Sequence, residues 1–328
     1  MTNQMPIGGR AEILAQNGRV PEALALLHDA AASKDPDACF SLALWHLAGR
    51  FVPRDLARTR AYLRAARELG DADAAAMEIA LTANGTGAPA DWSGALRLLR
   101  GAALRNSTAA AELKLVEAMD LADDGKPTRL PKAEQLVPDG AVIRFQNLLT
   151  AGECELIAQA AAGWLEPAVV VDPRTGQQVR HPHRTSDGAV LGPTRETLPI
   201  RAINQRIAAI SGTATEQGEA LIVLRYAPGQ EFRPHLDALP NTHNQRVITV
   251  LVYLNDTNGG ETRFPTYGLD VKPRMGDAIL FRNTLPGGSP DPRAIHAGAP
   301  VTQGVKWLAT RWIRARPFDV WSGPESAA

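Results

Sequence analysis

The first third of the chain has apolar residues at helical spacing, and this pattern repeats. Residues 35–70 and 71–106 align at an offset of 36 residues. The matching positions are acidic, small or apolar: Asp35/Asp71, Asp37/Asp73, Ala38/Ala74, Gly49/Gly85, Pro53/Pro89, Asp55/Asp91, Leu63/Leu99 and Ala66/Ala102. The pattern predicts helical repeats over about residues 10–120.

Each repeat reads as a helix, a loop that contains Gly and Pro, and a second helix. Asp55 and Asp91 stand where the second helices begin, and a carboxylate at that position accepts a hydrogen bond from the first helical turn. A unit of this length resembles the tetratricopeptide-like repeats, whose solenoids present a concave face to another polypeptide. The alternative is a short helical cap that only stabilises the next domain, because a self-supporting stack needs roughly three repeats.

The second part of the chain has a different pattern. Residues 121–137 lose the helical periodicity and gain Pro, Gly and charged residues, which predicts a linker. Short apolar runs separated by turn residues then predict a mainly β domain of the sandwich or barrel type, interrupted by one helix that begins after Thr150. The predicted strands cover residues 140–146, 168–172, 219–226, 246–255, 277–283 and 305–314.

Composition and charge narrow the class of protein. Lys plus Arg and Asp plus Glu both number 35, so no overall field favours nucleic acid or an anionic membrane. Cys39 and Cys154 are far apart in the chain, which argues against a disulfide framework and against a thiolate zinc site. No segment reads as a signal peptide or approaches the roughly 18 apolar residues of a membrane span. We therefore expect a cytoplasmic protein without nucleic-acid or membrane partners.

The strongest chemical signal is the segment GQEFRPHLDALP. His235 and Asp237 have the same parity, so on an extended segment both side chains point to one side. Two His and one carboxylate form the ligand set of non-haem Fe(II) oxygenases, although an H-x-D pair alone is a weak signal. The candidates for a third ligand are His181, His183, His243 and His296. His296 lies between the strands predicted at 277–283 and 305–314, where a closing strand can return it to His235.

Several motifs follow one another in a recognisable order: LRYAPGQEFRPHLD, NQRVITVLVYLND, GGETRFP, VKPRMGDAILF, AIHAGAPVTQGVKW and ATRWI. With LLTAGECELIAQA and HRTS upstream, they resemble the prolyl 4-hydroxylase family over residues 138–318. The resemblance implies an Fe(II)- and 2-oxoglutarate-dependent dioxygenase on a double-stranded β-helix, or jelly-roll. The fold class is then α+β multidomain: an α-solenoid, a linker, a dioxygenase domain and a C-terminal tail, at residues 1–120, 121–137, 138–318 and 319–328.

The resemblance also implies roles for individual residues. The family's iron ligands fall on His235, Asp237 and His296, and a carboxylate rather than a small residue at position 237 implies hydroxylation instead of halogenation. Lys306 stands where the family has the lysine that pairs with the distal carboxylate of 2-oxoglutarate, although a strand lysine can also guard a sheet edge. Tyr226 matches a tyrosine that contacts the co-substrate, and its alternative role is a half-buried strand aromatic.

Substrate contacts are expected from Trp312 and Arg246. Trp312 has the same parity as Lys306 along one strand, so both side chains should face the interior. The resemblance places Trp312 and Arg246 at the substrate site, whereas the alternative is a core Trp and a surface Arg. Phe232 departs from the family pattern, since members that act on peptidyl proline commonly carry Tyr there. This departure leaves the substrate class open. Arg184 matches a recurring family motif whose role does not follow from the residues.

The sequence thus favours a hydroxylase that acts on a peptide or protein, at proline, and releases succinate and CO2. Its cofactors and co-substrates would be Fe(II), 2-oxoglutarate and O2, with ascorbate as a further candidate. The helical repeats would dock the polypeptide substrate. One alternative is a hydroxylase of a free amino acid or other small molecule. The other is an inactive repeat-based scaffold, against which the complete ligand set and Lys306 argue.

Overall fold

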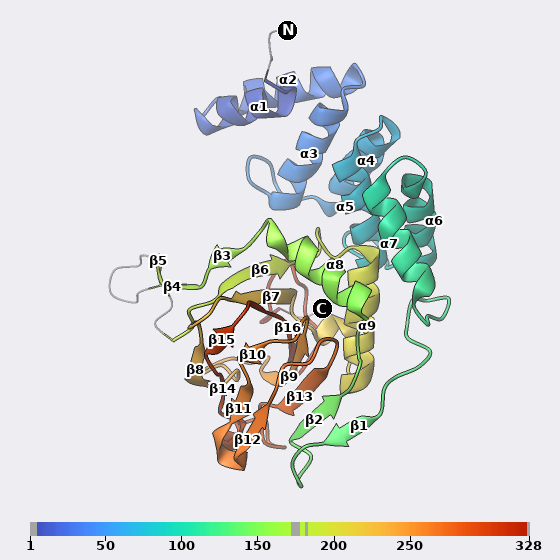
Figure 1. The fold of residues 1–328 in the computed structure, drawn as a ribbon. Coiled ribbons are helices and arrows are strands. Elements are labelled where there is room, and N and C mark those ends of the chain that lie inside the picture. The colour runs from blue at the N-terminus through green and yellow to red at the C-terminus, as the bar shows by residue number, and fades with distance from the viewer. Residues whose placement is uncertain (1–4, 172–177, 181–182, 327–328) are drawn as a thin grey trace. The chain divides into compact units, whose positions relative to one another are not determined.

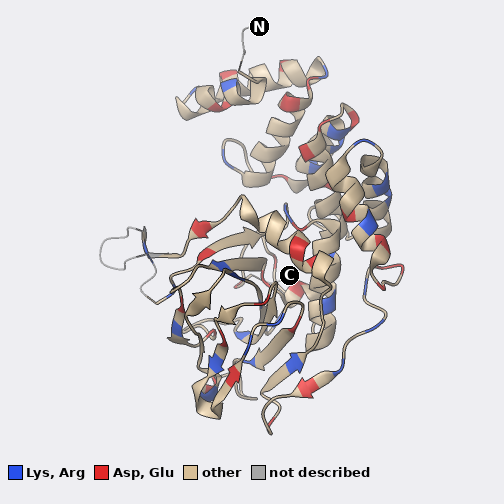
Figure 2. Ribbon diagram, viewed as in Figure 1, with Lys and Arg blue, Asp and Glu red and all other residues tan. Residues whose placement is uncertain are grey.

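The computed structural model describes residues 5–171, 178–180 and 183–326 (Figure 1). The chain divides into two compact units. The first comprises residues 1–119, 123–125 and 193–201, and the second comprises residues 120–122, 126–192 and 202–328. Lys, Arg, Asp and Glu are interspersed on both units (Figure 2). None of the described helices is long and apolar enough to cross a membrane.

The first unit is helical at the positions that the repeat predicts. Its helices are α1 (Ile7–Gln16), α2 (Val20–Ala32), α3 (Pro36–Ala48), α4 (Leu56–Glu68), α5 (Ala72–Asn84), α6 (Trp92–Ala103) and α7 (Ser107–Ala118). From α3 to α7, each helix packs against the next one in the chain. Most of the apolar repeat positions belong to the core of this unit, since the side chains of the following residues are fully buried, whereas Ala102 is half-buried: Ala38, Leu63, Ala66, Ala74 and Leu99.

The polar repeat positions set the ends of the helices. Asp55 and Asp91 cap α4 and α6 as predicted, and each side chain accepts a hydrogen bond from the backbone N–H three residues later. Asp71 does the same for α5. Gly49 and Gly85 end α3 and α5 with positive φ angles of 65° and 80°, a conformation in which glycine has no steric penalty. What recurs along the sequence is therefore the set of capping residues together with small or apolar residues that are buried.

The second unit contains the predicted antiparallel β structure. One sheet has the strand order β1-β2-β13-β9-β16-β7-β6-β3, and a smaller sheet has the order β12-β11-β14-β8. The strands of the larger sheet are β1 (Ala133–Gln135), β2 (Val142–Phe145), β3 (Glu166–Pro167), β6 (Asp187–Leu191), β7 (Leu221–Tyr226), β9 (Arg246–Tyr253), β13 (Ala278–Arg282) and β16 (Lys306–Arg314). Those of the smaller sheet are β8 (Phe232–His235), β11 (Thr262–Phe264), β12 (Leu269–Val271) and β14 (His296–Gly298).

Two further strand pairs complete the β structure: β4 (Val169–Val171) with β5 (Gln178–Arg180), and β10 (Asn258–Gly259) with β15 (Val301–Gln303). The apolar core draws on both large sheets, because Tyr253 and Phe281 on the larger sheet and Phe264 on the smaller one are fully buried in one cluster. In the central strands β9, β13 and β16 consecutive residues are buried, so both faces are covered, which is why these strands read as apolar runs in the sequence.

Two helices accompany the sheets, α8 (Ala151–Ala162) and α9 (Leu198–Ser211). Thr150 is the N-cap of α8, as predicted. It belongs to a capping box in which the Thr150 backbone N–H donates a hydrogen bond to the Glu153 carboxylate. Arg206 of α9 binds the Glu153 carboxylate with two hydrogen bonds of 2.9 and 2.8 Å. The same carboxylate therefore caps one helix and ties it to the other.

The sequence reading did not predict every element of this unit, and β1, β6 and α9 are among those that it missed. The strand β1 lies inside the segment that was predicted as a linker, and it pairs with β2. The helix α9 was not predicted, although its buried residues Ile200, Ile203 and Ile207 recur at helical spacing. β1 lacks a local signal, because it is exposed and owes its conformation to pairing with a neighbouring strand, whereas α9 carries its helical spacing in the sequence.

Candidate active site

Strand pairing brings two histidines from distant parts of the sequence together. In the smaller sheet β14 pairs antiparallel with β8, and His296 lies directly opposite His235. The centroids of the two imidazole rings are 4.2 Å apart. The third ligand predicted from the sequence is thus the one that the sheet returns to His235.

Asp237 follows β8 and completes a three-residue group. Its carboxylate oxygens lie 3.6 Å from the Nε2 atom of His235 and 3.6 Å from the Nε2 atom of His296. One ligand atom from each residue lies within 4.8 Å of the others. Among the described residues, no other group of three such side chains is arranged to hold a metal ion. The donor set fits one metal ion with coordination positions left open.

Backbone carbonyls orient both imidazole rings. The Nδ1 atom of His235 lies 2.8 Å from the Arg233 carbonyl oxygen, and that of His296 lies 3.0 Å from the Ala294 carbonyl oxygen. A carbonyl oxygen only accepts, so Nδ1 carries the proton in each ring. The Nε2 lone pairs are consequently free to bind a metal ion, and the rings are held in position before it arrives.

The protonation states also suit metal binding. Burial, together with the neighbouring His296, lowers the pKa of His235 to about 4. Burial by itself would raise the pKa of Asp237, but the two imidazoles and a hydrogen bond from Thr249 outweigh it and lower that pKa. At neutral pH the site therefore presents a neutral imidazole at His235 and a carboxylate at Asp237.

The three residues open into one pocket of the second unit. The residues that line it come from both sheets: Arg184, Leu224, Tyr226, Phe232, His235, Asp237, Leu251, Thr262, His296, Ala297, Gly298, Lys306, Leu308, Thr310 and Trp312. Lys306 and Trp312 both line it, as their shared parity on β16 predicts. The pocket thus combines a potential metal site with a buried cation and an aromatic wall.

Lys306 is a buried cation rather than an edge residue. Only 3% of its surface is exposed, and β16 runs between β7 and β9 inside the larger sheet. Its Nζ atom donates a 2.6 Å hydrogen bond to the Gly260 carbonyl oxygen. Gly260 has a φ of 70°, and a Cβ atom at this position would lie 3.0 Å from the Lys306 side chain. The Gly-Gly of the GGET motif therefore makes room for the lysine.

Burial lowers the pKa of Lys306 to about 8, because the charged form loses its hydration. Tyr226 lies directly across the ladder from Lys306, and burial raises its pKa to about 12. The Tyr226 hydroxyl is therefore neutral and able to donate a hydrogen bond at neutral pH. The alternative of a half-buried strand aromatic does not hold for Tyr226, whose ring is buried and lines the pocket.

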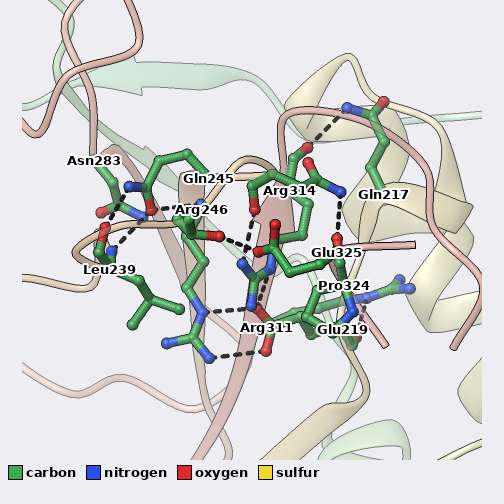
Figure 3. Close-up of polar contacts among 12 residues, drawn as sticks. Gln217, Glu219, Leu239, Gln245, Arg246, Asn283, Arg311, Arg314, Pro324 and Glu325 are labelled. Carbon is green, nitrogen blue, oxygen red and sulfur yellow. Dashed lines mark hydrogen bonds and ion pairs between the residues drawn. The ribbon is translucent and has the colours of Figure 1, made fainter. Parts of the chain in front are cut away.

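Arg246 packs against Trp312 beside the pocket, and Figure 3 shows the contacts of its guanidinium with the Glu219 carboxylate. The guanidinium carbon of Arg246 lies 3.7 Å from the centroid of the Trp312 ring, which is cation–π geometry. Arg246 also donates two hydrogen bonds, of 2.6 and 2.8 Å, to the Glu219 carboxylate. Arg314 donates a third, of 2.6 Å, to the same carboxylate. Arg246 itself does not line the pocket but backs the tryptophan that does.

Comparison with known proteins agrees with this geometry. The family model for the 2OG-Fe(II) oxygenase superfamily matches residues 221–314. Probable prolyl 4-hydroxylase 10 of Arabidopsis thaliana is 36% identical over 223 residues, which are 60% of this chain and 76% of that protein. Prolyl 4-hydroxylase 1 of the same plant is 40% identical over 195 residues, or 53% and 69% of the two chains. The chain belongs to the prolyl 4-hydroxylase family.

A solved structure of a viral collagen prolyl hydroxylase from Paramecium Bursaria Chlorella virus-1, in complex with 2OG, is also similar. It is 28% identical and covers 55% of this chain and 99% of that chain, with a TM-score of 0.45. As a member of the prolyl 4-hydroxylase family, the protein is a 2-oxoglutarate-dependent dioxygenase that uses Fe(II), 2-oxoglutarate and O2.

Phe232, the residue that departs from the expected family pattern, lies against a predicted iron ligand. Its ring stacks on the His235 imidazole with a centroid distance of 3.4 Å and an interplanar angle of 17°. Arg184 pairs with the Phe232 backbone in an isolated bridge, and its guanidinium carbon lies 5.6 Å from the Phe232 ring centroid. The HRTS motif therefore contributes to the same pocket, although the sequence alone assigned Arg184 no role.

The other candidate histidines that the structure describes, His183 and His243, take no part in the three-residue group. His183 is exposed, and its backbone carbonyl accepts a hydrogen bond from the Arg233 amide. His181 lies outside the described residues. Sequence reasoning missed Glu219, which precedes β7 and carries no motif that would reveal its ion pairs with Arg246 and Arg314.

Proposed function

We propose that this dioxygenase hydroxylates a prolyl residue in a peptide or protein. The observation that supports this most strongly is the shared pocket, in which the His-Asp-His group, the buried Lys306 and the Trp312 ring all meet. The names of the curated relatives, prolyl 4-hydroxylases, point to the same substrate class. An aromatic wall beside a metal site suits a ring such as that of proline.

In this proposal His235, Asp237 and His296 hold Fe(II). Their nitrogen and oxygen donors fit this metal, and a three-residue ligand set leaves positions for the co-substrate and oxygen. Bound Fe(II) would supply the oxidative chemistry that converts 2-oxoglutarate and O2 to succinate and CO2 and places a hydroxyl group on the substrate. The protein's own residues orient the ligands, bind the co-substrate and shield the site from water.

Lys306 would bind the distal carboxylate of 2-oxoglutarate, with Tyr226 as a second donor. A carboxylate beside the Lys306 ammonium forms a charge-assisted hydrogen bond and compensates the cost of burying the cation. Trp312 would contact the substrate ring, while Arg246, which lies beside the pocket, would hold the tryptophan from behind and so take part in substrate binding through it. These roles rest on burial and contacts within one pocket.

The domain organisation completes the proposal. The two sheets around one apolar core support a double-stranded β-helix over residues 138–318, preceded by the linker at 121–137. The helices of residues 1–120, with their repeated caps, support a tetratricopeptide-like solenoid that docks the polypeptide substrate. Residues 319–328 remain a C-terminal tail in this scheme.

A direct test compares three substrates in the presence of Fe(II) and 2-oxoglutarate. A set of proline-containing peptides should raise succinate formation and gain one oxygen by mass spectrometry. The same peptides with alanine in place of proline, and free proline, should not. Hydroxylation of the free amino acid alone would favour the small-molecule alternative. Repeating the assay with and without ascorbate tests whether this reductant sustains turnover.

The docking role of the helices needs a separate test. A fragment of residues 131–328 retains every strand and every proposed ligand, so it should still decarboxylate 2-oxoglutarate slowly. It should lose activity on a full-length protein target but keep activity on a short peptide at high concentration, because docking raises the local concentration of the target. Equal activity of fragment and full chain on every substrate would contradict docking. An insoluble fragment would indicate that the helices act as a structural cap.

A further inference from the structure

One hydroxyl group reaches the proposed metal site from the opposite sheet. The Thr249 side chain donates a 2.7 Å hydrogen bond to the Oδ2 atom of Asp237. Asn283, which directly follows β13, donates a 2.8 Å hydrogen bond from its side-chain amide to the same Thr249 oxygen. The three side chains are buried and come from three different segments of the second unit.

The chain of hydrogen bonds has one direction. A threonine hydroxyl has a single hydrogen atom, and Asn283 already occupies an acceptor position on the Thr249 oxygen. The hydroxyl hydrogen therefore points to Asp237, whose carboxylate can only accept. If these hydrogen bonds ran in the opposite direction, the Thr249 oxygen and the Asp237 carboxylate would face each other as two acceptors. Asn283 thus orients Thr249, and Thr249 orients the carboxylate.

Thr249 lies within a strand that is paired on both sides, whereas Asp237 lies in a loop. Thr249 lies on β9, paired with Phe281 of β13 on one side and with Trp312 of β16 on the other. Asn283 is anchored through its backbone, which donates to the Val247 carbonyl oxygen at 2.9 Å. Asp237 instead lies beyond the end of β8, the last strand of the smaller sheet. The hydrogen bond to Thr249 therefore fixes a loop side chain to the interior of the larger sheet.

We propose that Thr249, oriented by Asn283, holds the Asp237 carboxylate so that it binds the metal ion through one oxygen. The hydrogen bond on Oδ2 fixes the rotation of the carboxylate, with Oδ1 3.6 Å from the Nε2 atom of His235 and Oδ2 3.6 Å from that of His296, and Oδ1 is the oxygen that Thr249 does not occupy. A carboxylate that occupies one coordination position leaves three positions free for the co-substrate and oxygen. Thr249 and Asn283 are positioning residues in this account, and the account rests on the proposed role of Asp237 as a ligand.

The experiment measures metal binding by the full-length apoprotein without 2-oxoglutarate. Co(II) alone is titrated by calorimetry, and its visible absorption reports the coordination geometry. Thr249→Val, which keeps the shape but removes the hydroxyl, should weaken Co(II) binding about 10- to 100-fold and alter the absorption spectrum. Thr249→Ser keeps the hydroxyl and should restore affinity to within about threefold of the unmodified protein.

Two further variants serve as controls. Thr59→Val removes another fully buried hydroxyl, in helix α4 of the other unit, and should leave Co(II) affinity and spectrum unchanged. Asn283→Ala keeps the Thr249 hydroxyl but removes the group that orients it, so affinity should fall about threefold or more. Asn283→Ala also keeps the test decisive if Thr249→Val does not fold.

Unchanged affinity and spectrum in folded Thr249→Val, or in Asn283→Ala if the first variant unfolds, would overturn the positioning role. A loss of thermal stability without a change in Co(II) binding would do so too, because it indicates a structural hydrogen bond only. Asp237→Ala separates this outcome from failure of the proposed function. If Asp237→Ala binds Co(II) normally, the ligand assignment itself is wrong. If it loses binding while Thr249→Val does not, only the positioning role fails.

Discussion

Replacement of Lys306 by Met removes the buried cation from the pocket while keeping a side chain of similar length. A charge-assisted hydrogen bond to a carboxylate contributes about 1.5–3 kcal/mol, which corresponds to roughly 10- to 150-fold in affinity. We therefore expect Lys306→Met to raise the KM for 2-oxoglutarate by that factor and to leave Co(II) affinity unchanged. Lys272→Met, which removes an exposed lysine of the same unit, should leave both quantities unchanged.

The pH dependence of stability and of co-substrate affinity provides a second test of the role of Lys306. The pKa of Lys306 falls from 10.5 to about 8 on folding, so the charged form destabilises the apoprotein by about 3 kcal/mol below pH 8. Between pH 8 and 10.5 the unfolded chain binds more protons than the folded one at this residue, so the contribution to the free energy of unfolding rises with pH. Over the same range the free enzyme loses the cation, and its affinity for 2-oxoglutarate should fall.

The measurements are initial rates of succinate formation at varied 2-oxoglutarate, and chemical unfolding of the apoprotein, each across pH 7 to about 10. In the unmodified protein the free energy of unfolding should rise with pH above pH 8 and the affinity for 2-oxoglutarate should fall. Lys306→Met should show neither change. The Gly260 carbonyl loses its donor in this variant, at a cost of about 1–3 kcal/mol, which offsets part of the stability gained by removing the charge. An unchanged KM for 2-oxoglutarate in Lys306→Met would refute the reasoning, because it would show that the ammonium does not contact the co-substrate.

Three other changes follow from the contacts in the pocket. His235→Ala or His296→Ala should abolish iron-dependent turnover, because no other described residue offers a replacement ligand, and should leave the circular dichroism spectrum unchanged. Normal 2-oxoglutarate decarboxylation by either variant would disprove the assignment of these histidines as iron ligands. Arg246→Gln removes the cation over the Trp312 ring and should raise the KM for peptide about two- to tenfold without altering uncoupled 2-oxoglutarate decarboxylation, and equal effects on both reactions would contradict a substrate role. Phe232→Tyr should keep the Co(II) affinity within about threefold and change only the kinetics with peptide. A large change in Co(II) affinity would contradict this, because it would show that the stacking of residue 232 on the His235 imidazole controls metal binding.

Local features of the sequence determined the elements themselves. Asp55 and Asp91 cap their helices, and Thr150 caps α8, because a cap is a contact between residues three apart in the chain. The shared parity of Lys306 and Trp312 on β16 likewise follows from strand geometry alone, and both line the pocket. Motif order then indicated the enzyme family, which the comparisons confirm.

Only the tertiary structure decided which distant residues meet. The register between β8 and β14 places His296 opposite His235, and this register depends on pairing between segments that are far apart in the chain. The hydrogen bonds from Arg246 to Glu219 and from Thr249 to Asp237 likewise connect separate segments and leave no periodic pattern in the sequence. Caps and parity depend on neighbours along the chain, whereas strand register and buried polar contacts depend on how the sheets pack, and only folding brings those partners together.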